Sequence, residues 1–323
     1  MLVFRFLPVL GLLACAEAPS SGIIPGGAPA SSEIAPIADA RLSPADLPPN
    51  TRELRFGVTP YLDLASLRAQ FTPIARYVGS RLGVTVTVVT ATTYDALIDL
   101  VVKGEVDIAA LSPLSYVVAR ERAPDLRLVA SELTSGSIHF SSLVLVRDDD
   151  PAQTLSELRG RRIGFVDERS TTGFLYPYDA FLTAGLDPER DFASVSLLRT
   201  HPAAVRSLME GRVDAACVAS GMFEVARDSA GASGRTLLDP TRVRVLANVG
   251  RVRYDSLVVR GAIPASGAAK IASVFGGLSR RTAEGRAVLA AAVRIAGWVA
   301  AADAHYSPIR EVRARVDTHR AAK

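Results

Sequence analysis

The chain has 323 residues, of which 49% are apolar and 22% are charged, so it is long enough to bury a sizeable core and to form two domains or lobes. Its formal net charge is +4, but Lys and Arg are spread among nearly as many acidic residues. That balance tolerates an anionic ligand or a membrane surface and argues against nucleic acid as a partner. The two cysteines, Cys15 and Cys217, are too few for a disulfide framework or a metal cluster.

The first fifteen residues, "MLVFRFLPVLGLLAC", predict an export signal, because they are apolar after one early Arg and too short to span a bilayer. They end in Leu-Leu-Ala-Cys15, which looks like the lipobox of bacterial lipoproteins. We therefore expect residues 1–14 to be a lipoprotein signal peptide, with the sulfur of Cys15 lipidated and the protein anchored to a membrane on the periplasmic side. The alternative is an ordinary signal peptide followed by an incidental cysteine.

Residues 15–52 are rich in Ala, Pro, Ser and Gly and have no hydrophobic period. This composition predicts a flexible tether. After it the chain has no apolar run of about 18 residues, and together with the export signal this places the folded body outside the cytoplasm.

The folded body reads as alternating strands and helices. Strands are predicted over 54–59, 84–90, 106–111, 126–131, 140–149, 161–167, 194–200 and 213–218. Helices are predicted over 63–83, 93–104, 112–122, 170–185 and 201–211. The alternation indicates an α/β fold with mainly parallel strands, and it restarts after Asp150-Pro151.

A short internal sequence repeat indicates two similar halves. The stretch "KGEVDIAAL" at 103–111 and the stretch "EGRVDAACV" at 210–218 each join a helix that ends at Gly to a buried strand that follows Val-Asp. We expect one lobe over 53–145 plus 250–323 and another over 146–249. The crossings between them are then expected near Val144–Asp148 and Val243–Val258.

Hydroxyl side chains follow five of the predicted strands. In open α/β sheets, ligands bind beyond the carboxyl ends of strands, where helix N-termini present free N–H groups. Each hydroxyl alone is typical of a helix N-cap. Five of them at equivalent strand ends, split between two lobes, predict a ligand cleft. They lie in Thr59-Pro60-Tyr61, Thr92-Thr93-Tyr94, Ser112-Pro113, Ser170-Thr171-Thr172-Gly173 and Thr200-His201.

From Leu54 to Val312 the sequence resembles the phosphonate/phosphite (PhnD-like) substrate-binding proteins of ABC importers, a branch of the type II periplasmic binding fold. The resemblance is carried by "FGVTPYLDLASLRAQFTPIARYVGSRLGV", "YDALIDLVVKGEVDIAALSPLSYVVA", "STTGFLYP", the His of "RTHPAAV", and "GWVAAADAHYSPIREV". It implies a two-lobed Venus-flytrap architecture, with a mainly parallel sheet flanked by helices in each lobe and closure by a hinge.

The resemblance also implies a site. The family's Ser-Thr-Ser/Thr-Gly element clamps an oxyanion and falls here on Ser170, Thr171, Thr172 and Gly173. Tyr94 and His201 match a ligand-facing Tyr and a His beside the site, and Thr59 and Ser112 add hydroxyls at strand ends. Hydroxyls, successive N–H groups and the helix dipole suit a tetrahedral anion, and Gly173 would let the backbone come close. Such a site binds without a full counter-charge, which keeps the ligand releasable.

Some positions depart from the family pattern. Phe140 stands where the family has a second Tyr, and Pro202 stands where an acid commonly follows the His. Ala219-Ser220 stand where the family often has an Asp, which only Glu224 or Asp228 on the next helix could replace. A carboxylate pairs with an ammonium group, so we expect a ligand without an amine, such as a fully deprotonated or small oxyanion.

Other candidates for chemistry are weaker. Cys217 could bind a soft metalloid, but its apolar strand favours a buried structural thiol. Three histidines lie in different segments without metal-ligand spacing, namely His139, His305 and His319. Paired carboxylates and a Ser/His/Asp grouping are not evident, so we expect neither an enzyme nor a metal or cofactor.

The sequence therefore predicts a monomeric binding protein that delivers a small oxyanion to an ABC permease in the inner membrane. The alternative is a protein of the same fold that reports its ligand to a membrane sensor kinase.

Overall fold

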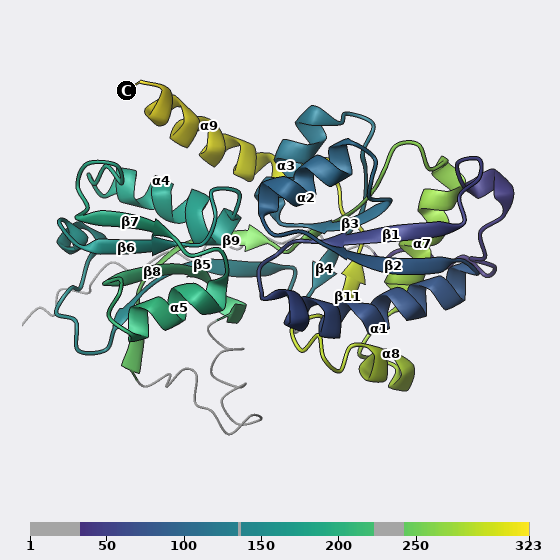
Figure 1. Cartoon of the computed structure of the whole chain (residues 1–323), viewed down its shortest axis with the longest axis horizontal. Coiled ribbons are helices and arrows are strands. Elements are labelled where there is room, and N and C mark those ends of the chain that lie inside the picture. The colour runs from purple at the N-terminus through teal and green to yellow at the C-terminus, as the bar shows by residue number, and fades with distance from the viewer. Residues whose placement is uncertain (1–32, 135–136, 223–241, 323) are drawn as a thin grey trace, which may run out of the picture. The chain divides into compact units, whose positions relative to one another are not determined.

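The computed structural model describes residues 33–134, 137–222 and 242–322. Within them, two β-sheets are each flanked by helices (Figure 1). The first sheet has the order β11-β4-β10-β3-β1-β2 and the second has the order β7-β6-β8-β5-β9. We call the first sheet with its helices the first lobe and the second sheet with its helices the second lobe.

The first sheet comprises β1 (Glu53–Val58), β2 (Thr85–Thr90), β3 (Ile108–Leu111), β4 (Arg127–Leu133), β10 (Ser256–Val259) and β11 (Gly297–Val299). Its helices are α1 (Leu64–Leu82), α2 (Tyr94–Val102), α3 (Pro113–Arg122), α7 (Ala265–Gly277) and α8 (Ala283–Val288), with short turns η1 (Pro44–Asp46) and η5 (Asp303–Tyr306). The second sheet comprises β5 (His139–Arg147), β6 (Arg162–Phe165), β7 (Ser194–Leu197), β8 (Ala215–Ala219) and β9 (Val243–Arg253). Its helices are α4 (Tyr176–Thr183) and α5 (His201–Met209), with turns η2 (Leu155–Leu158) and η3 (Thr171–Leu175), and α9 (Ser307–Ala321) ends the chain.

Both sheets are mixed. In the first, β1 pairs in parallel with β2 and β3, whereas β10 runs antiparallel to β3 and β4. In the second, β6 pairs in parallel with β7 and β8, whereas β5 runs antiparallel to β8 and β9. The reversed strands β5 and β10 are the first strands that the chain forms after each crossing between the sheets. The two-lobed α/β prediction is confirmed, with three reversed strands, β5, β10 and β11, added to the parallel ones.

The first crossing lies earlier than its predicted place near Val144–Asp148. Strand β4 ends at Leu133 in the first sheet, and β5 begins at His139 in the second. The chain returns between Arg253 and Ser256, inside the predicted range 243–258. Residues 139–145 therefore belong to the second lobe, since the apolar run of β5 is buried between β8 and β9. An apolar run predicts a buried strand but not the sheet that the strand joins.

Residues 33–52, predicted as part of the tether, pack on the first lobe. The Leu42 N–H donates to the carbonyl of Leu82 at 2.8 Å. Asp46 is buried and accepts a hydrogen bond from Lys270 of α7 at 2.8 Å, which lowers the pKa of its carboxyl. The tether predicted over 15–52 is therefore wrong for residues 33–52, and its remaining residues, Cys15 and the signal segment lie outside the described residues.

The repeated sequence at 103–111 and 210–218 corresponds to a repeated helix-to-strand turn. Helices α2 and α5 each end two residues before a Gly with positive φ, Gly104 and Gly211, both at +70°. Strands β3 and β8 follow and occupy inner positions in their sheets. Glycine is favoured at both places because the left-handed conformation strains other residues.

The aspartate in each copy of the repeat forms a hydrogen bond with a neighbouring strand. Asp107 accepts a hydrogen bond from the Arg55 N–H at 2.8 Å, and Asp214 accepts one from the Arg162 N–H at 2.9 Å. Each carboxylate also pairs with a guanidinium, that of Arg260 at 2.9 Å and that of Arg162 at 2.7 Å. The same carboxylate contact thus holds β1 at its third residue in one lobe and β6 at its first residue in the other.

Helix α9 joins the two lobes. Arg313 pairs with Glu121 of the first lobe at 2.7 Å, and Arg315 makes two hydrogen bonds to Asp179 of α4 at 3.0 and 2.7 Å. Arg320 adds a contact to Glu168 at 2.9 Å. Figure 1 shows α9 running past α3 to α4. The assignment of 250–323 to the first lobe alone is therefore wrong for this helix.

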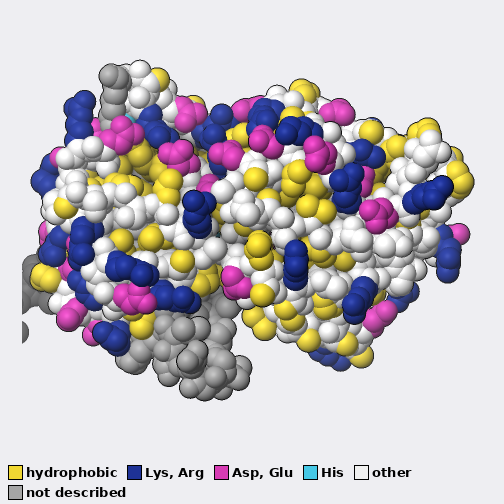
Figure 2. Space-filling view, viewed as in Figure 1, with side chains coloured by type: hydrophobic (Ala, Val, Ile, Leu, Met, Phe, Trp, Pro, Cys, Tyr) yellow, Lys and Arg dark blue, Asp and Glu magenta, His cyan; other side chains and the backbone are white. Residues whose placement is uncertain are grey.

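Acidic and basic side chains are interspersed on the face shown in Figure 2, so this face carries no single-sign patch. Among the helices described, none combines the length and the apolar character needed to cross a bilayer.

We expect Asp107→Asn and Asp214→Asn each to lower the free energy of unfolding by about 2 kcal/mol, because each loses a buried charge-assisted bond to a strand N–H. Asp99→Asn is the control: it removes an exposed partner of Arg122 and should cost at most about 0.5 kcal/mol. Urea unfolding measures all three, and equal effects at Asp99 and Asp214 would contradict this role.

The Asp214 effect should depend on pH. The hydrogen bond from Arg162 lowers the pKa of Asp214 to about 2. A depressed folded-state pKa stabilises the fold above the unfolded value of about 3.9, and this contribution is lost as pH falls toward 2. The difference between wild type and Asp214→Asn should therefore shrink over that range.

Candidate functional site

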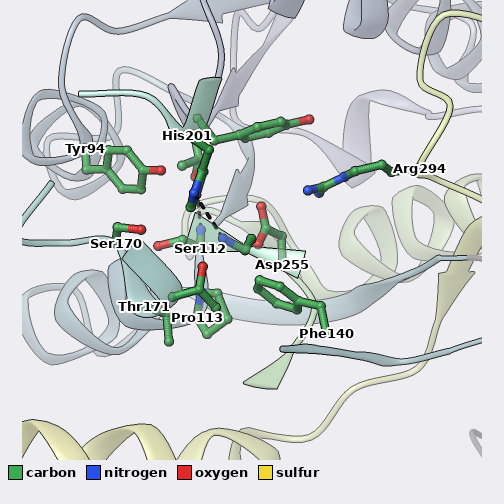
Figure 3. A pocket seen from close by; sticks show the side chains of 13 residues that line it. Tyr94, Ser112, Pro113, Phe140, Ser170, Thr171, His201, Asp255 and Arg294 are labelled. Atoms are coloured by element: carbon green, nitrogen blue, oxygen red, sulfur yellow. Dashed lines mark hydrogen bonds between the residues drawn. The ribbon is translucent and has the colours of Figure 1, made fainter. Parts of the chain in front are cut away.

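A small cavity lies where the two lobes meet, at the carboxyl ends of strands from both sheets (Figure 3). Its lining residues are Thr59, Tyr61, Tyr94, Ser112, Pro113, Phe140, Ser170, Thr171, Thr172, His201, Ala219, Asp255 and Arg294. Its volume is about 20 Å³. That exceeds the roughly 10–15 Å³ that one water needs and is far below the ~300–1,000 Å³ of drug-sized sites. The cavity therefore suits a very small ligand.

Seven of the eight predicted ligand residues line this cavity, and their role toward a ligand stays a prediction. Three of them open the helical segment formed by η3 and α4. Ser170 caps it by accepting a hydrogen bond from the Gly173 N–H at 3.0 Å, and Thr171 and Thr172 follow as its first residues. The Leu175 N–H bonds back to the carbonyl of Ser170, so η3 is a wide π-helical turn.

This helix start supplies donors. The N–H groups of Thr171 and Thr172 lie in the first turn, where no earlier helical carbonyl can accept their hydrogen bonds. Both residues are buried beside the cavity. The positive end of the helix dipole lies at the same place, so the arrangement favours an anion.

Gly173, the eighth predicted residue, does not line the cavity. A Cβ on it would lie 2.5 Å from a side-chain carbon of Val166. The close approach that requires glycine here is therefore to β6 and its extension, and the expected role of Gly173 toward a ligand stays a prediction.

Two of the lining hydroxyls link the lobes. The Leu114 N–H of α3 donates to the Thr171 hydroxyl at 2.8 Å, and the Ser112 hydroxyl donates to the carbonyl of Arg169 at 3.2 Å. Thr59 donates to the carbonyl of Ala110 and accepts from the Ser112 N–H, each at 3.0 Å. Thr59, Ser112 and Thr171 thus hold the walls of the cavity through bonds within the protein.

His201 is buried at the start of α5. Its Nδ1 accepts a hydrogen bond from the Ala219 N–H at 3.2 Å. Burial, and then the charge of Arg294, lower the pKa of His201 to about 3, so the ring is neutral at physiological pH. A neutral ring that accepts at Nδ1 carries its proton on Nε2, which makes Nε2–H a donor.

Tyr94 lies beside Ser170, with its hydroxyl turned toward the middle of the cavity (Figure 3). Burial raises the pKa of this phenol well above its usual value. The hydroxyl therefore stays protonated and can donate a hydrogen bond. Phe140 lines the wall and stacks on Tyr254, with ring centroids 4.6 Å apart.

Arg294 and Asp255 lie on the opposite side of the cavity, and sequence reasoning missed both (Figure 3). Arg294, in the loop between α8 and β11, is half-buried, and its guanidinium carbon is 5.2 Å from the centre of the Tyr61 ring. Its side chain makes no hydrogen bond or ion pair with any residue that the structure describes. Burial disfavours its charge, but the neighbours Tyr61, Glu132 and Asp255 raise its pKa, so it stays cationic.

The expectation of a site without a full counter-charge is therefore wrong. The stretch around Arg294, "AAAVRIAGW", matches no motif, and it is the fold that brings this loop to the cavity. The available signal for Asp255 was its place inside the predicted second crossing, as an acid between two buried strands.

Asp255 also corrects the expectation that the pocket lacks a carboxylate and that the chain has no paired carboxylates. Asp255 is 8% exposed, and burial raises the pKa of its carboxyl to about 6. Glu132 of β4 lies alongside: it is 2% exposed, and its N–H donates to the Asp255 carbonyl at 2.9 Å. Burial and the charge of Asp255 raise the pKa of Glu132 to about 8.

The remaining candidates lie outside the cavity. Cys217 is buried within β8, which supports the packing role. His305 accepts a hydrogen bond from the Ala302 N–H, and His319 lies 3.4 Å from Asp187. Glu224 and Asp228 fall outside the described residues. Within 33–134, 137–222 and 242–322, no group of three or more His, Cys, Asp or Glu residues could hold a metal ion.

Thr171→Val should expose the link between the lobes. It keeps the side-chain shape but removes the acceptor of the buried Leu114 N–H, which is worth about 1–2 kcal/mol. We expect the Leu114 amide to exchange with solvent about tenfold faster, as measured by NMR. Thr183→Val is the control, because the Thr183 hydroxyl bonds only to the Asp179 carbonyl within α4. Unchanged exchange at Leu114 would rule out the link.

Comparison with known proteins gives the family. The sequence profile described as "ABC transporter, phosphonate, periplasmic substrate-binding protein" matches residues 56–306. The phosphate-import protein PhnD of Mycolicibacterium smegmatis is 26% identical over 55% of this chain and 54% of its own length. The phosphonates-binding periplasmic protein of Escherichia coli is 31% identical over 42% of this chain and 41% of its own. The chain thus spans about half of the length of these curated relatives or less.

Two solved structures share the fold. A binding protein component of an ABC phosphonate transporter from Pseudomonas aeruginosa has a TM-score of 0.73 and 21% identity, over 83% of this chain and 87% of that one. PhnD1 from Prochlorococcus marinus in complex with methylphosphonate has a TM-score of 0.73 and 19% identity, over 82% and 98% of the two chains. These likenesses agree with the two-lobed fold. Because the family profile covers most of the chain, the chain belongs to the periplasmic substrate-binding proteins of phosphonate ABC transporters.

Proposed function

We propose that this protein captures a small tetrahedral oxyanion of the phosphonate, phosphite or phosphate class between its lobes and delivers it to an ABC importer. The observation that carries the proposal is the composition of one small cavity. A helix start with free N–H groups faces it from one side, and a guanidinium without an ion-pair partner among the described residues faces it from the other. Such an arrangement suits several acceptor oxygens on one central atom.

Different residues of the cavity lining offer different interactions to an anion. Thr171 and Thr172 offer backbone N–H groups, and Tyr94 and His201 offer an O–H and an N–H. Arg294 supplies the charge. Because these donors come from both lobes, the anion completes the closed arrangement of the site, and a closed site excludes water. The chemistry is binding without bond cleavage, which fits a carrier in place of an enzyme.

The cavity also limits the substituent on the anion. Phe140, Pro113 and Ala219 form an apolar part of the lining, which accommodates a hydrogen or methyl group. A volume of about 20 Å³ leaves little room for an aminoethyl chain in this closed arrangement. Size therefore supports a ligand without an amine, although the carboxylate of Asp255 removes the original reason for that expectation.

The relatives support this class of ligand by their names: phosphate import, phosphonate binding, and a structure that holds methylphosphonate. We propose that the permease of an ABC transporter is the partner, that the protein acts as a monomer in the periplasm, and that Cys15 carries the lipid anchor.

A sensory role is the second candidate. The tetrathionate sensor histidine kinase TtrS of Salmonella typhimurium is 29% identical over 40% of this chain and 22% of its own length. That similarity favours a lobe architecture that can also report its ligand to a kinase. Genes adjacent to this one separate the two roles by encoding either an ATPase and permease or a histidine kinase.

A thermal-shift panel tests the ligand class. Ligand binding stabilises the folded state by RT ln(1 + [L]/Kd), or about 4 kcal/mol at a thousandfold excess over Kd. We expect a rise in Tm with phosphite, methylphosphonate or phosphate, and a smaller rise with 2-aminoethylphosphonate. Sulfate and arsenate complete the panel. If no member of the panel raises Tm, the proposed function is wrong.

Arg294→Gln tests the counter-charge. Removing the only cation that lines the described cavity should weaken binding of methylphosphonate by about 30-fold or more, as measured by calorimetry. Arg76→Gln removes an equal charge from the exposed face of α1 and should leave Kd within about twofold. Similar losses in both variants would indicate long-range attraction in place of direct contact.

A further inference from the structure

Glu132 and Asp255, which we call the carboxyl pair, are buried together without a fixed partner. Glu132 lies on β4, and Asp255 directly precedes the neighbouring strand β10 of the first sheet. Neither carboxyl makes a hydrogen bond or a salt bridge with any residue in the described part of the chain. The Asp255 carboxyl faces the cavity, and Figure 3 shows it near the guanidinium of Arg294. A buried acceptor directed into a cavity indicates a ligand or a proton.

The charge balance requires a proton on this pair. If both carboxyls were ionised, their two negative charges would outweigh the single positive charge of Arg294, and an anion entering the cavity would be repelled. With one proton on the pair, the three side chains are neutral together. With two protons, they carry a net positive charge that matches an anion.

We propose that anion binding is coupled to proton uptake by Glu132 and Asp255, which together hold one proton in the empty site and take up a second from solvent when the anion enters, leaving Arg294 to pair with the anion. This inference rests on the proposed function. No bond within the anion changes, and water supplies the proton.

The ionisation of the pair supports the coupling. Burial raises the pKa of Asp255 to about 6, and burial with the charge of Asp255 raises that of Glu132 to about 8. These values belong to the pair as a unit. A bound anion adds a further negative charge and raises both.

The other titratable and charged groups that face the pair come from several elements. They are Tyr61 before α1, Tyr94 of α2, His201 of α5, Tyr254 beside Asp255, Arg294 before β11 and Tyr306 of η5. Burial raises the pKa of Tyr61, Tyr94 and Tyr306, and His201 is neutral above a pKa of about 3. The carboxyl pair is therefore the group here that changes charge between pH 5 and 9.

The sign of the pH effect follows. A carboxyl with a raised pKa is uncharged below that pKa and becomes negative above it. Affinity for the anion should therefore be highest on the acidic side. It should fall as the pH rises above about 6, where the empty pair holds only one proton, and more steeply above about 8, where Glu132 loses its proton as well. Each proton that binding requires contributes a fall that approaches about tenfold per pH unit.

The test compares Kd for methylphosphonate between pH 5.5 and 9 in wild type, Glu132→Gln and Glu105→Gln. The ratio of the wild-type Kd to the Glu132→Gln Kd cancels the ionisation of methylphosphonate itself. We expect this ratio to rise about tenfold per pH unit above pH 8. Glu105→Gln removes an exposed charge before β3, at the opposite end of the strand from the cavity, and should follow wild type. A ratio that stays constant within twofold overturns the coupling.

A second measurement does not depend on the folding of Glu132→Gln. Calorimetry of wild type and Asp255→Asn at pH 8, in two buffers of different ionisation enthalpy, gives the protons taken up on binding. We expect greater uptake by wild type, and equal uptake would overturn the inference. If wild type binds none of the anions, the proposed function fails; if it binds with a constant ratio and equal uptake, only the coupling fails.

Discussion

The structure depends on how one half-buried positive charge is balanced. Arg294 approaches a closed cavity, and the acidic groups beside it, Asp255 and Glu132, are themselves buried with raised pKa values. A charge removed from water needs a counter-charge, and here the fold provides acids that are only partly ionised near neutral pH. With one proton on the pair the three side chains are neutral together, so in the proposed coupling an anion is matched by positive charge only when a second proton enters from solvent.

The rest of the fold brings donors to that charge. In each lobe an aspartate, Asp107 or Asp214, holds a parallel strand within its first three residues, so the opposite ends of the strands lie level with one another. The helices that follow begin at this edge and direct their N-termini into the cavity. The Thr171 hydroxyl then bonds to the Leu114 N–H across the two lobes. Regular strand register is thus the cause of the site's geometry, and the side chains of the cavity refine it.

Sequence reasoning predicted the parts of the site that local pattern encodes. Ser170, Thr171 and Thr172 stand at a strand-to-helix junction, and such junctions have recognisable caps. Arg294 and Asp255 could not be found in this way, because a loop arginine and an aspartate between strands reach the cavity only through tertiary packing. The crossing was misplaced at Val144–Asp148 for a similar reason: the apolar run of β5 is compatible with either sheet, and only strand pairing decides between them. Residues 33–52 were taken for tether because their few packing contacts have no periodicity.

The contacts that hold the two lobes together differ in strength. The ion pairs that α9 makes with the second lobe, such as Arg315 with Asp179, are largely exposed and each contributes little. They can hold the lobes near one another without fixing them. The contacts beside the cavity are buried, but they leave a guanidinium and the carboxyl pair without hydrogen-bond or ion-pair partners among the described residues. Under the proposed function an anion would bond to those groups, so the ligand would supply much of the free energy that favours the closed arrangement. Closure would then depend on capture of the anion.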